Sequence, residues 1–295
     1  MGKVIALGFF DGVHLGHQAL FAKTREIADE TGLLPAVFTF DCHPVSALSG
    51  RAVDLLNDLS TRKQLILQKG KMHTIIVQKF DTNFASLTWE QFVVQLQQEH
   101  DVAHIVCGHN FRFGAGGAGN TRNLGEKCKE LGIGLSVVEE VRYAGEELCS
   151  TQIRKLLLEG KMEAANELLG QPHVLVGTVL HGRKLGCVIG APTVNLKFPE
   201  QVLRLPNGAY ATKVTLADGS VYLAATSIGT RPTVEEAGEI LVESHLLDYT
   251  GDLYGQEIAV HFYHYLRREI KFAHLDALSV QIQADITSVR DMLEQ

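Results

Sequence analysis

In the first part of the chain, up to about Gly170, short apolar runs alternate with segments of helical periodicity. A short apolar run between turns is typical of a buried strand, and apolar residues three and four positions apart indicate an amphipathic helix. Strands that alternate with helices predict a parallel sheet with helices on both faces, which binds a nucleotide at the ends of its strands. The expected strands are Val4–Leu7, Ala36–Phe40, Thr74–Val77, His104–Cys107 and Leu135–Val138, and the expected helices are Ala19–Thr31, Thr61–Lys69, Trp89–Glu99 and Leu124–Leu131.

Beyond residues 170–172 the pattern changes to short β-rich runs, and helical periodicity returns only from Leu275 to Leu293. Asp218-Gly219 lies between two of these runs, and Asp-Gly is typical of a tight hairpin turn. An antiparallel β-barrel with one C-terminal helix fits this order. With 295 residues the chain is long enough for two cores, so we expect one domain over residues 1–171 and a second over residues 172–295. The expected strands of the second domain are Ala209–Leu216, Val221–Ile228, Glu239–Leu247 and Gln256–Leu266.

Composition excludes several classes of function. The formal net charge of −7 argues against a large nucleic-acid-binding face. The five cysteines are widely spread and form no Cys-x-x-Cys pair, so neither a disulfide framework nor a zinc cluster is expected. The sequence shows neither a signal peptide nor an apolar segment of membrane-spanning length, so we expect a cytoplasmic protein with no membrane partner. The oligomeric state is left open.

The string LGFFDGVHLGH, from Leu7 to His17, follows the first expected strand and precedes a helical pattern. His14 and His17 lie three residues apart near the first turn of that helix, so both imidazoles can reach the same ligand. Free backbone N–H groups and the positive end of the helix dipole attract phosphate at such a position. We therefore interpret the pair as a phosphate site. Two histidines that cap a turn, or a two-ligand metal site, are the alternatives.

Three further stretches fall where a parallel sheet would present them to a ligand: FDCHP at residues 40–44, GHNFRFG at residues 108–114 and CSTQIR at residues 149–154. The second stretch runs into a glycine-rich segment, where backbone can approach a ligand such as a phosphate closely and Arg112 offers a planar fork of donors. An ordinary surface loop is the alternative. The third stretch opens a helix, with Ser150 or Thr151 as a suitable N-cap and Arg154 within the first turn.

The chemistry of the second half concentrates in GTVLHGRKLGCVIGAPTVN, residues 177–195. Its repeated glycines imply a loop that packs its backbone against a ligand. Thr193 and Asn195 supply two hard oxygens, which suit Mg²⁺ beside a nucleotide phosphate. Taken alone, Pro-Thr-Val-Asn is also a common turn. The glycines of this array are Gly177, Gly182, Gly186 and Gly190.

Taken in order, these motifs resemble those of the prokaryotic bifunctional riboflavin kinase/FMN adenylyltransferase family, also called FAD synthetase. Residues 8–17 match its GxFDGVHxGH motif, and residues 192–195 match PTxN. Residues 149–154 resemble ISSTxIR, residues 108–114 resemble GxDFRFG, and residues 267–272 match RxExKF. The resemblance implies a Rossmann-like α/β nucleotidyltransferase domain, then an antiparallel, riboflavin kinase-like β-barrel domain with a C-terminal helix.

In this family the N-terminal domain transfers the adenylyl group of ATP to FMN, which gives FAD and pyrophosphate. The terminal phosphate of FMN attacks the α-phosphorus of ATP, so the protein has to align the substrates and neutralise charge. By resemblance, His14 and His17 stabilise that charge and Arg154 holds the β- and γ-phosphates. Asp11 is a flavin- or nucleotide-side contact or a turn former. The other implied contacts are Gly8, Phe9, Ser150 and Thr151 for ATP, and Asn110 and Arg112 for the flavin.

The resemblance implies that the C-terminal domain phosphorylates riboflavin to FMN with MgATP. Glu243 would act as general base on the ribityl hydroxyl that attacks the γ-phosphate, unless it is only a charge at a strand edge. Thr193 and Asn195 would bind Mg²⁺, and Arg231 would contact the flavin. The glycines Gly177, Gly182, Gly186 and Gly190 would surround the phosphates of ATP.

The sequence departs from the family pattern mostly in this second half. Cys187, Ala191 and Ser227 stand where the family commonly has arginine, phenylalanine and asparagine. An arginine lost near phosphates removes a charge-assisted contact worth roughly 1.5–3 kcal/mol, so we expect weakened or altered kinase activity. Two alternatives to a bifunctional enzyme are open: a single-activity FMN adenylyltransferase with an impaired kinase half, and a non-catalytic flavin-binding regulator.

Overall fold

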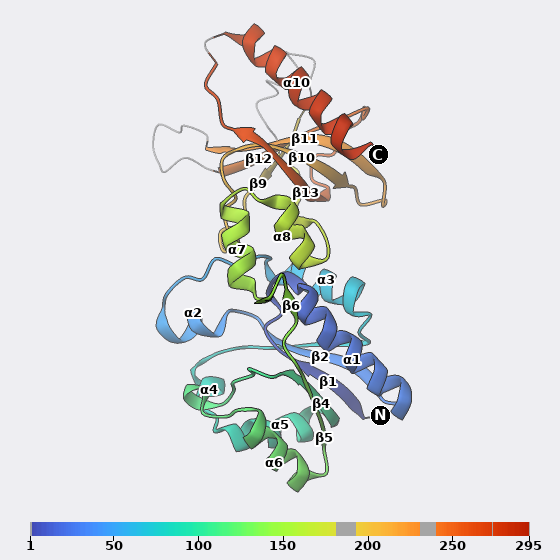
Figure 1. Cartoon of the computed structure of the whole chain (residues 1–295), viewed down its shortest axis with the longest axis vertical. Helices are drawn as coiled ribbons and strands as arrows, with labels where there is room; N and C mark the ends of the chain where they lie inside the picture. Colours follow the sequence, from blue (N-terminus) through green and yellow to red (C-terminus); the bar gives the residue numbers. More distant parts are fainter. Residues whose placement is uncertain (1, 181–192, 231–239, 273, 295) are drawn as a thin grey trace. The chain divides into compact units, whose positions relative to one another are not determined.

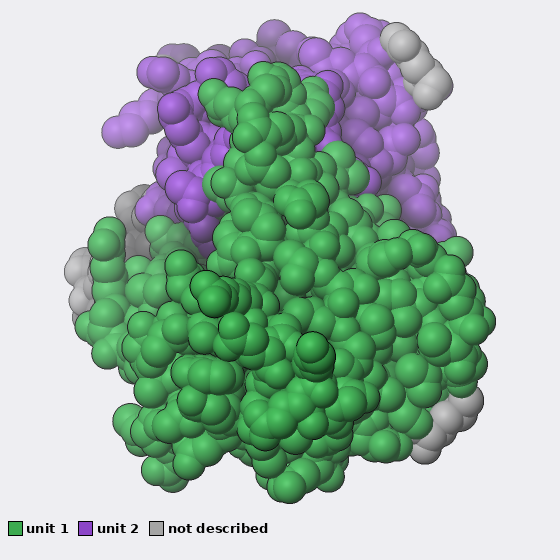
Figure 2. All heavy atoms as spheres, turned by 60° about the horizontal axis from the view of Figure 1, so that its bottom comes forward, with its two compact units in different colours: residues 1–55, 59–150 green, residues 56–58, 151–295 purple. Residues whose placement is uncertain are grey.

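The computed structural model describes residues 2–180, 193–230, 240–272 and 274–294 (Figure 1). The chain forms two compact units (Figure 2), the first made of residues 1–55 and 59–150 and the second of residues 56–58 and 151–295. The helices α7 (Ser150–Leu158) and α8 (Met162–Leu169) therefore belong almost entirely to the second unit. The domain boundary expected between residues 171 and 172 stays a prediction.

The first unit is built on a five-stranded parallel sheet with the strand order β3-β2-β1-β4-β5 (Figure 1). The central strand, β1, has Val4, Ile5 and Ala6 fully buried. The parallel α/β sheet expected from the sequence is confirmed, and each strand extends one to three residues beyond the expected run. The strands are β1 (Lys3–Leu7), β2 (Leu34–Phe40), β3 (Thr74–Gln78), β4 (Val102–Gly108) and β5 (Gly134–Val138).

Helices cover both faces of this sheet because β1 is apolar on both sides. Ile5 packs with Phe92 and Leu124, which come from the helices α5 and α6. Val4, which points the opposite way, packs with Ile27 of helix α1. The helices of this unit are α1 (Leu15–Thr31), α2 (Pro44–Ser49), α3 (Leu59–Gly70), α4 (Thr82–Ala85), α5 (Trp89–His100) and α6 (Thr121–Leu131), with 3₁₀ turns η1 (Asp11–Val13) and η2 (Ala115–Gly117) and a small hairpin of β6 (Arg142–Tyr143) and β7 (Glu146–Glu147).

The second unit contains an antiparallel six-stranded sheet with the order β8-β13-β10-β11-β12-β9. A bridge between Leu180 and Asn195 brings the two edge strands together, so the sheet is a nearly closed barrel, as the sequence predicts. Two of its strands, β8 and β9, were not among the expected ones. The strands are β8 (His173–Thr178), β9 (Val194–Lys197), β10 (Gly208–Thr215), β11 (Val221–Thr230), β12 (Ile240–Leu246) and β13 (Glu257–Arg268).

The C-terminal helix α10 (Leu275–Leu293) closes this barrel from outside. Val289 and Leu293 are buried against Ala211 of β10. Arg267 Nε and Nη2 donate to the two carboxylate oxygens of Asp285 at 2.9 and 2.6 Å, and Asp285 is 8% exposed. A two-pronged pair of this kind at a half-buried position fixes the register of the helix as well as its distance from the sheet.

His173, at the start of β8, is 2% exposed, and burial lowers its pKa from 6.5 to about 4. The unfolded chain therefore binds more protons than the folded one between these values. Stability is complete above about pH 6.5 and falls towards pH 4, at up to about 1.4 kcal/mol per pH unit from this residue. His173→Phe should flatten that slope in urea unfolding measured from pH 4 to 7.

The matched control is the same substitution at an exposed histidine of the same unit, His274→Phe, which should leave the slope as it is in the parent chain. Parallel curves for His173→Phe and the parent would show that this buried imidazole does not set the acid sensitivity of the second unit.

Candidate functional site

A strained turn connects β1 to α1 and sets the positions of the two motif histidines. Phe10 and Val13 both have left-handed backbone, with φ of 60° and 46°, around Gly12 at φ 77°. Such conformations cost free energy in residues other than glycine, and they persist where the surrounding structure fixes them. The turn delivers His14 as the N-cap of α1 and His17 as its third residue, so the expected position at the first turn of a helix is observed.

The two histidine rings stack on each other, with 3.6 Å between ring centroids and 21° between ring planes. Gly16 makes this possible because a Cβ there would lie 3.1 Å from the His14 ring, closer than such an atom normally approaches. Gly8 has the same relation to Phe10, whose ring would be 2.8 Å from an added Cβ. At both glycines a side-chain ring packs closely against the backbone, and a larger residue would require that ring to shift.

Burial, His14 and the positive charge of Arg62 together hold the pKa of His17 well below 6.5. His17 is therefore neutral at pH 7, and its Nδ1 is buried with no hydrogen-bond partner in the described part of the chain. A neutral imidazole can donate one N–H to an incoming anion. It does so without placing a second positive charge beside Arg62. Stacking of the two rings at 3.6 Å is compatible with this neutral state.

Arg62 is a fully buried cation, 1% exposed, that sequence reasoning missed. Its guanidinium lies 4.0 Å from the centroid of the Phe9 ring and donates to the carbonyl oxygen of Phe40. In the sequence it is one basic residue among several in α3, and nothing in that pattern marks it as buried. The structure therefore places its positive charge next to Phe9, within the motif that runs from Leu7 to His17.

The histidine pair opens into a cavity of about 310 Å³ within the first unit. Its walls come from three segments: the β1–α1 turn with Gly8 and Phe9, the start of the GHNFRFG loop, and the stretch that runs from β5 to Ser150. Ser150 Oγ donates to the carbonyl oxygen of Asp11 at 3.1 Å, which ties the start of α7 to the turn. The cavity therefore gathers three of the motifs that the sequence singled out.

The remaining predicted residues of the first half fall in different places. Asn110 lines the cavity, whereas the Asp11 side chain is 3% exposed and does not line it. Arg112 is exposed and also lies outside the lining. Thr151 and Arg154 lie on α7 beyond Ser150, in the second unit. Lining residues that the sequence did not point to include Val138–Val141 and Glu147.

In the second unit the register of the barrel pairs Glu243 on β12 with Asn195 on β9. On its other side Glu243 is paired with Ser227 on β11. Residues directly opposite each other on antiparallel strands point to the same face of the sheet, so the two candidate residues are neighbours there. Asn195 is 6% exposed and Glu243 is half-buried.

The same unit has a cavity of about 440 Å³, and neither Asn195 nor Glu243 is among the described residues that line it. Thr193 lines it, together with the segment from Tyr249 to Tyr254, which the sequence analysis did not single out as a wall. Gly177 lies on β8, where a Cβ would be in ordinary contact with Leu196 at 3.7 Å, so its smallness is not required by the described residues. Gly182, Gly186, Gly190, Arg231, Cys187 and Ala191 lie outside the residues that the structure describes.

Two family models match the chain, one over each half. The model described as FAD synthetase matches residues 1–152, and the model described as riboflavin kinase matches residues 169–293. A parallel α/β domain followed by an antiparallel barrel, matched in this order by the two models, defines the chain as a two-part flavin nucleotide-forming transferase.

Relatives that are named after the same two activities align with almost the whole chain. The bifunctional riboflavin kinase/FMN adenylyltransferase of Listeria monocytogenes is 35% identical over 98% of this chain and 92% of its own. The protein of that name from Haemophilus influenzae is 36% identical over 98% and 94%, and the one from Bacillus subtilis is 37% identical over 96% and 90%. The chain belongs to the bifunctional riboflavin kinase/FMN adenylyltransferase family, which confirms the family and the enzyme class expected from its motifs.

A solved structure shares the fold over the same length. A protein titled macrolide-efflux protein, from Streptococcus pneumoniae, matches 98% of this chain and 94% of its own with a TM-score of 0.86 at 28% identity. Across the described residues, none of the helices has the length and apolar character needed to cross a membrane.

The depressed pKa of His17 gives a direct spectroscopic prediction. In an NMR pH titration its ring signals should stay those of a neutral imidazole through pH 6.5 and change only at lower pH. Arg62→Gln should raise the pKa of His17, because one of the causes of the depression is removed.

Arg62→Lys, which keeps the positive charge, is the control and should leave the titration near that of the parent. A His17 signal that titrates at pH 6.5 or above in the parent chain would contradict the neutral, stacked arrangement.

Proposed function

We propose that this chain carries out both reactions of its family, one in each unit. The second unit transfers the γ-phosphoryl group of ATP to riboflavin and gives FMN and ADP. The first unit joins FMN to the adenylyl group of ATP and gives FAD and pyrophosphate. The observation that supports the first assignment most strongly is the stacked histidine pair at the N-terminus of α1 inside a cavity of about 310 Å³.

In the first unit, His14 and His17 would donate N–H bonds to the α-phosphate of ATP as charge grows on it. The N-terminus of α1 adds its backbone dipole at the same place. The Gly8–Phe9 backbone and Ser150, which line the cavity, would hold the rest of the triphosphate, and Asn110 would contact FMN. The roles that the family resemblance implies for Thr151, Arg154, Asp11 and Arg112, which do not line this cavity, stay predictions. Alignment and neutralisation suffice for this step, because the phosphate of FMN is itself the nucleophile.

In the second unit, Glu243 would accept the proton of the ribityl hydroxyl as that oxygen attacks the γ-phosphorus. Thr193 and Asn195 present hard oxygens of the kind that Mg²⁺ prefers, and Asn195 pairs in register with Glu243, so the donor set fits this ion. When bound there, Mg²⁺ supplies charge neutralisation to the phosphates of ATP. We assign the phosphate contacts to Gly177, Gly182, Gly186 and Gly190, and a flavin contact to Arg231. A cytoplasmic location stays a prediction.

A second candidate is an enzyme that retains only adenylyl transfer. Ser227, which replaces the asparagine common in the family, is paired directly with Glu243. The substitution thus lies beside the residue proposed as the base. A shorter side chain at this position reaches less far towards Glu243 and its substrate, so it could slow the kinase reaction without affecting the first unit.

Substitution of one residue in each unit should separate the two reactions. His17→Ala should slow FAD formation from FMN by about 100-fold or more, since one donor to the transition state is lost, and should leave FMN formation intact. Glu243→Ala should slow FMN formation from riboflavin by about 100-fold or more and spare FAD formation from FMN. Both are measured by chromatography of the flavins, with His73→Ala, an exposed histidine of the first unit, as control.

Equal loss of both activities in either variant would contradict the division into two sites. For the parent chain, FMN and then FAD from riboflavin supports the bifunctional enzyme, whereas FAD only from supplied FMN supports the single-activity enzyme. A chain that binds flavin and forms no product from either substrate would be the regulator.

A further inference from the structure

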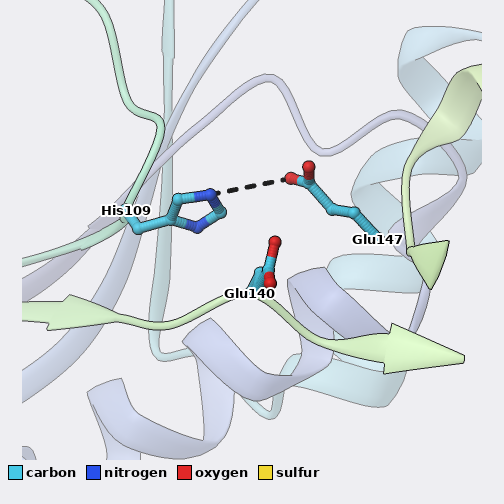
Figure 3. A group of neighbouring side chains, drawn as sticks. All are labelled: His109, Glu140 and Glu147. Atoms are coloured by element: carbon cyan, nitrogen blue, oxygen red, sulfur yellow. Dashed lines mark ion pairs between the residues drawn. The ribbon is translucent and has the colours of Figure 1, made fainter. Parts of the chain in front are cut away.

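Three side chains that the sequence analysis did not assign together converge on the cavity of the first unit (Figure 3). His109 follows β4, Glu140 follows β5, and Glu147 lies on β7 of the small hairpin. Their ligand atoms all lie within 4.8 Å of one another, and His109 Nε2 is 3.7 Å from Glu147 Oε1. Among the described residues, this is where three such groups come within reach of one ion.

The surroundings hold these groups in place. The backbone N–H of His109 donates to the carbonyl oxygen of Val138 at 3.0 Å, which fixes the loop after β4 to the end of β5. Asn110 Nδ2 donates to Glu147 Oε1 at 3.1 Å, and Arg142 pairs with Glu140 Oε1. The contacts to Glu140 and Glu147 are each made to the Oε1 atom of the carboxylate. Neighbours that orient ligating side chains are typical of metal sites.

The charge of this wall is unusual for its position. The cavity that we propose binds ATP and FMN, both strongly anionic, is lined by Glu139, Glu140 and Glu147. Carboxylates facing a polyanion in a partly buried place are unfavourable unless a positive charge lies near them. Arg142 is paired with Glu140, and a cation held by both Glu140 and Glu147 would remove the rest of that conflict.

The donor set selects the kind of cation. One imidazole nitrogen and two carboxylate oxygens suit a divalent transition metal such as Mn²⁺ or Zn²⁺, whereas Mg²⁺ and Ca²⁺ prefer oxygen ligands alone. The set differs in this way from the oxygens of Thr193 and Asn195 in the second unit.

We propose that His109, Glu140 and Glu147 bind one divalent transition-metal ion at the wall of the adenylyltransferase cavity. Ion binding does not depend on the proposed function, whereas the benefit to an anionic substrate rests on it. The ion would add positive charge at the wall of a cavity that the histidine pair also lines.

The test is direct binding of Mn²⁺ to the full chain, without ATP or flavin. Mn²⁺ is the probe because it avoids the cysteine thiols that complicate work with Zn²⁺. Loss of the free-ion EPR signal gives stoichiometry and affinity, and pulsed EPR reports coupling to a ligating nitrogen. We expect nitrogen coupling in the parent chain, and at least about tenfold weaker binding of one Mn²⁺ equivalent in His109→Gln and in Glu147→Gln.

The matched control is another histidine–glutamate pair, His264 and Glu163 in the second unit, whose Nδ1 and Oε1 atoms lie 2.5 Å apart without a third ligand of this type. His264→Gln and Glu163→Gln should bind Mn²⁺ as the parent does. Absence of nitrogen coupling in the parent, or unchanged Mn²⁺ affinity in both cavity variants, would overturn the proposal. Neither result would bear on flavin turnover, because neither measurement includes a substrate.

Discussion

The first unit depends on a strand that is buried on both faces and on the strained turn that leaves it. β1 is hydrogen-bonded to β2 on one side and to β4 on the other, and Val4, Ile5 and Ala6 have no exposed surface. A strand fixed in this way cannot shift its end without disrupting both helical layers. The rigid strand keeps the residues of the following turn in their left-handed conformation. The turn in turn fixes the position of the stacked histidines.

Electrostatics in this unit is arranged around neutral donors instead of a cluster of cations. Burial and Arg62 keep His17 neutral, so the positive potential comes from a buried guanidinium and from the N-terminus of α1. Two imidazolium ions at 3.6 Å would repel each other before any substrate arrived. A neutral His17 avoids that repulsion and can still donate an N–H to an anion.

Sequence periodicity predicted the features that are local in the chain. The five parallel strands, the four longer helices of the first unit and the C-terminal helix each carry their own apolar pattern. β8 and β9 were missed because they are short and lie at the two ends of a glycine-rich stretch that was interpreted as a loop. Arg62 looked like any surface cation, since its burial depends on Phe9, which comes from another segment.

The same limit applies to His109, Glu140 and Glu147, whose proximity comes from three separate segments of the first unit. Glu140 and Glu147 follow His109 by 31 and 38 positions in the sequence. No sequence spacing predicts contact between residues so far apart unless the sheet and the hairpin that bring them together are known. By contrast, the motif His14-Leu15-Gly16-His17 could be interpreted from sequence because one helical turn contains it entirely.

The sites proposed in the two units differ in how they would neutralise the charge of phosphate, and the difference follows from their folds. A parallel sheet delivers helix N-termini and loop ends to one edge, so the first unit can use backbone dipoles and nitrogen donors. An antiparallel barrel offers instead side chains paired across strands, as Glu243 and Asn195 are. A carboxylate such as that of Glu243 repels phosphate unless a cation lies between them. The Mg²⁺ proposed for the second unit would thus be a consequence of building its site on a barrel, whereas the metal proposed for the first unit would serve the acidic wall of the cavity and leave the histidine pair as it is.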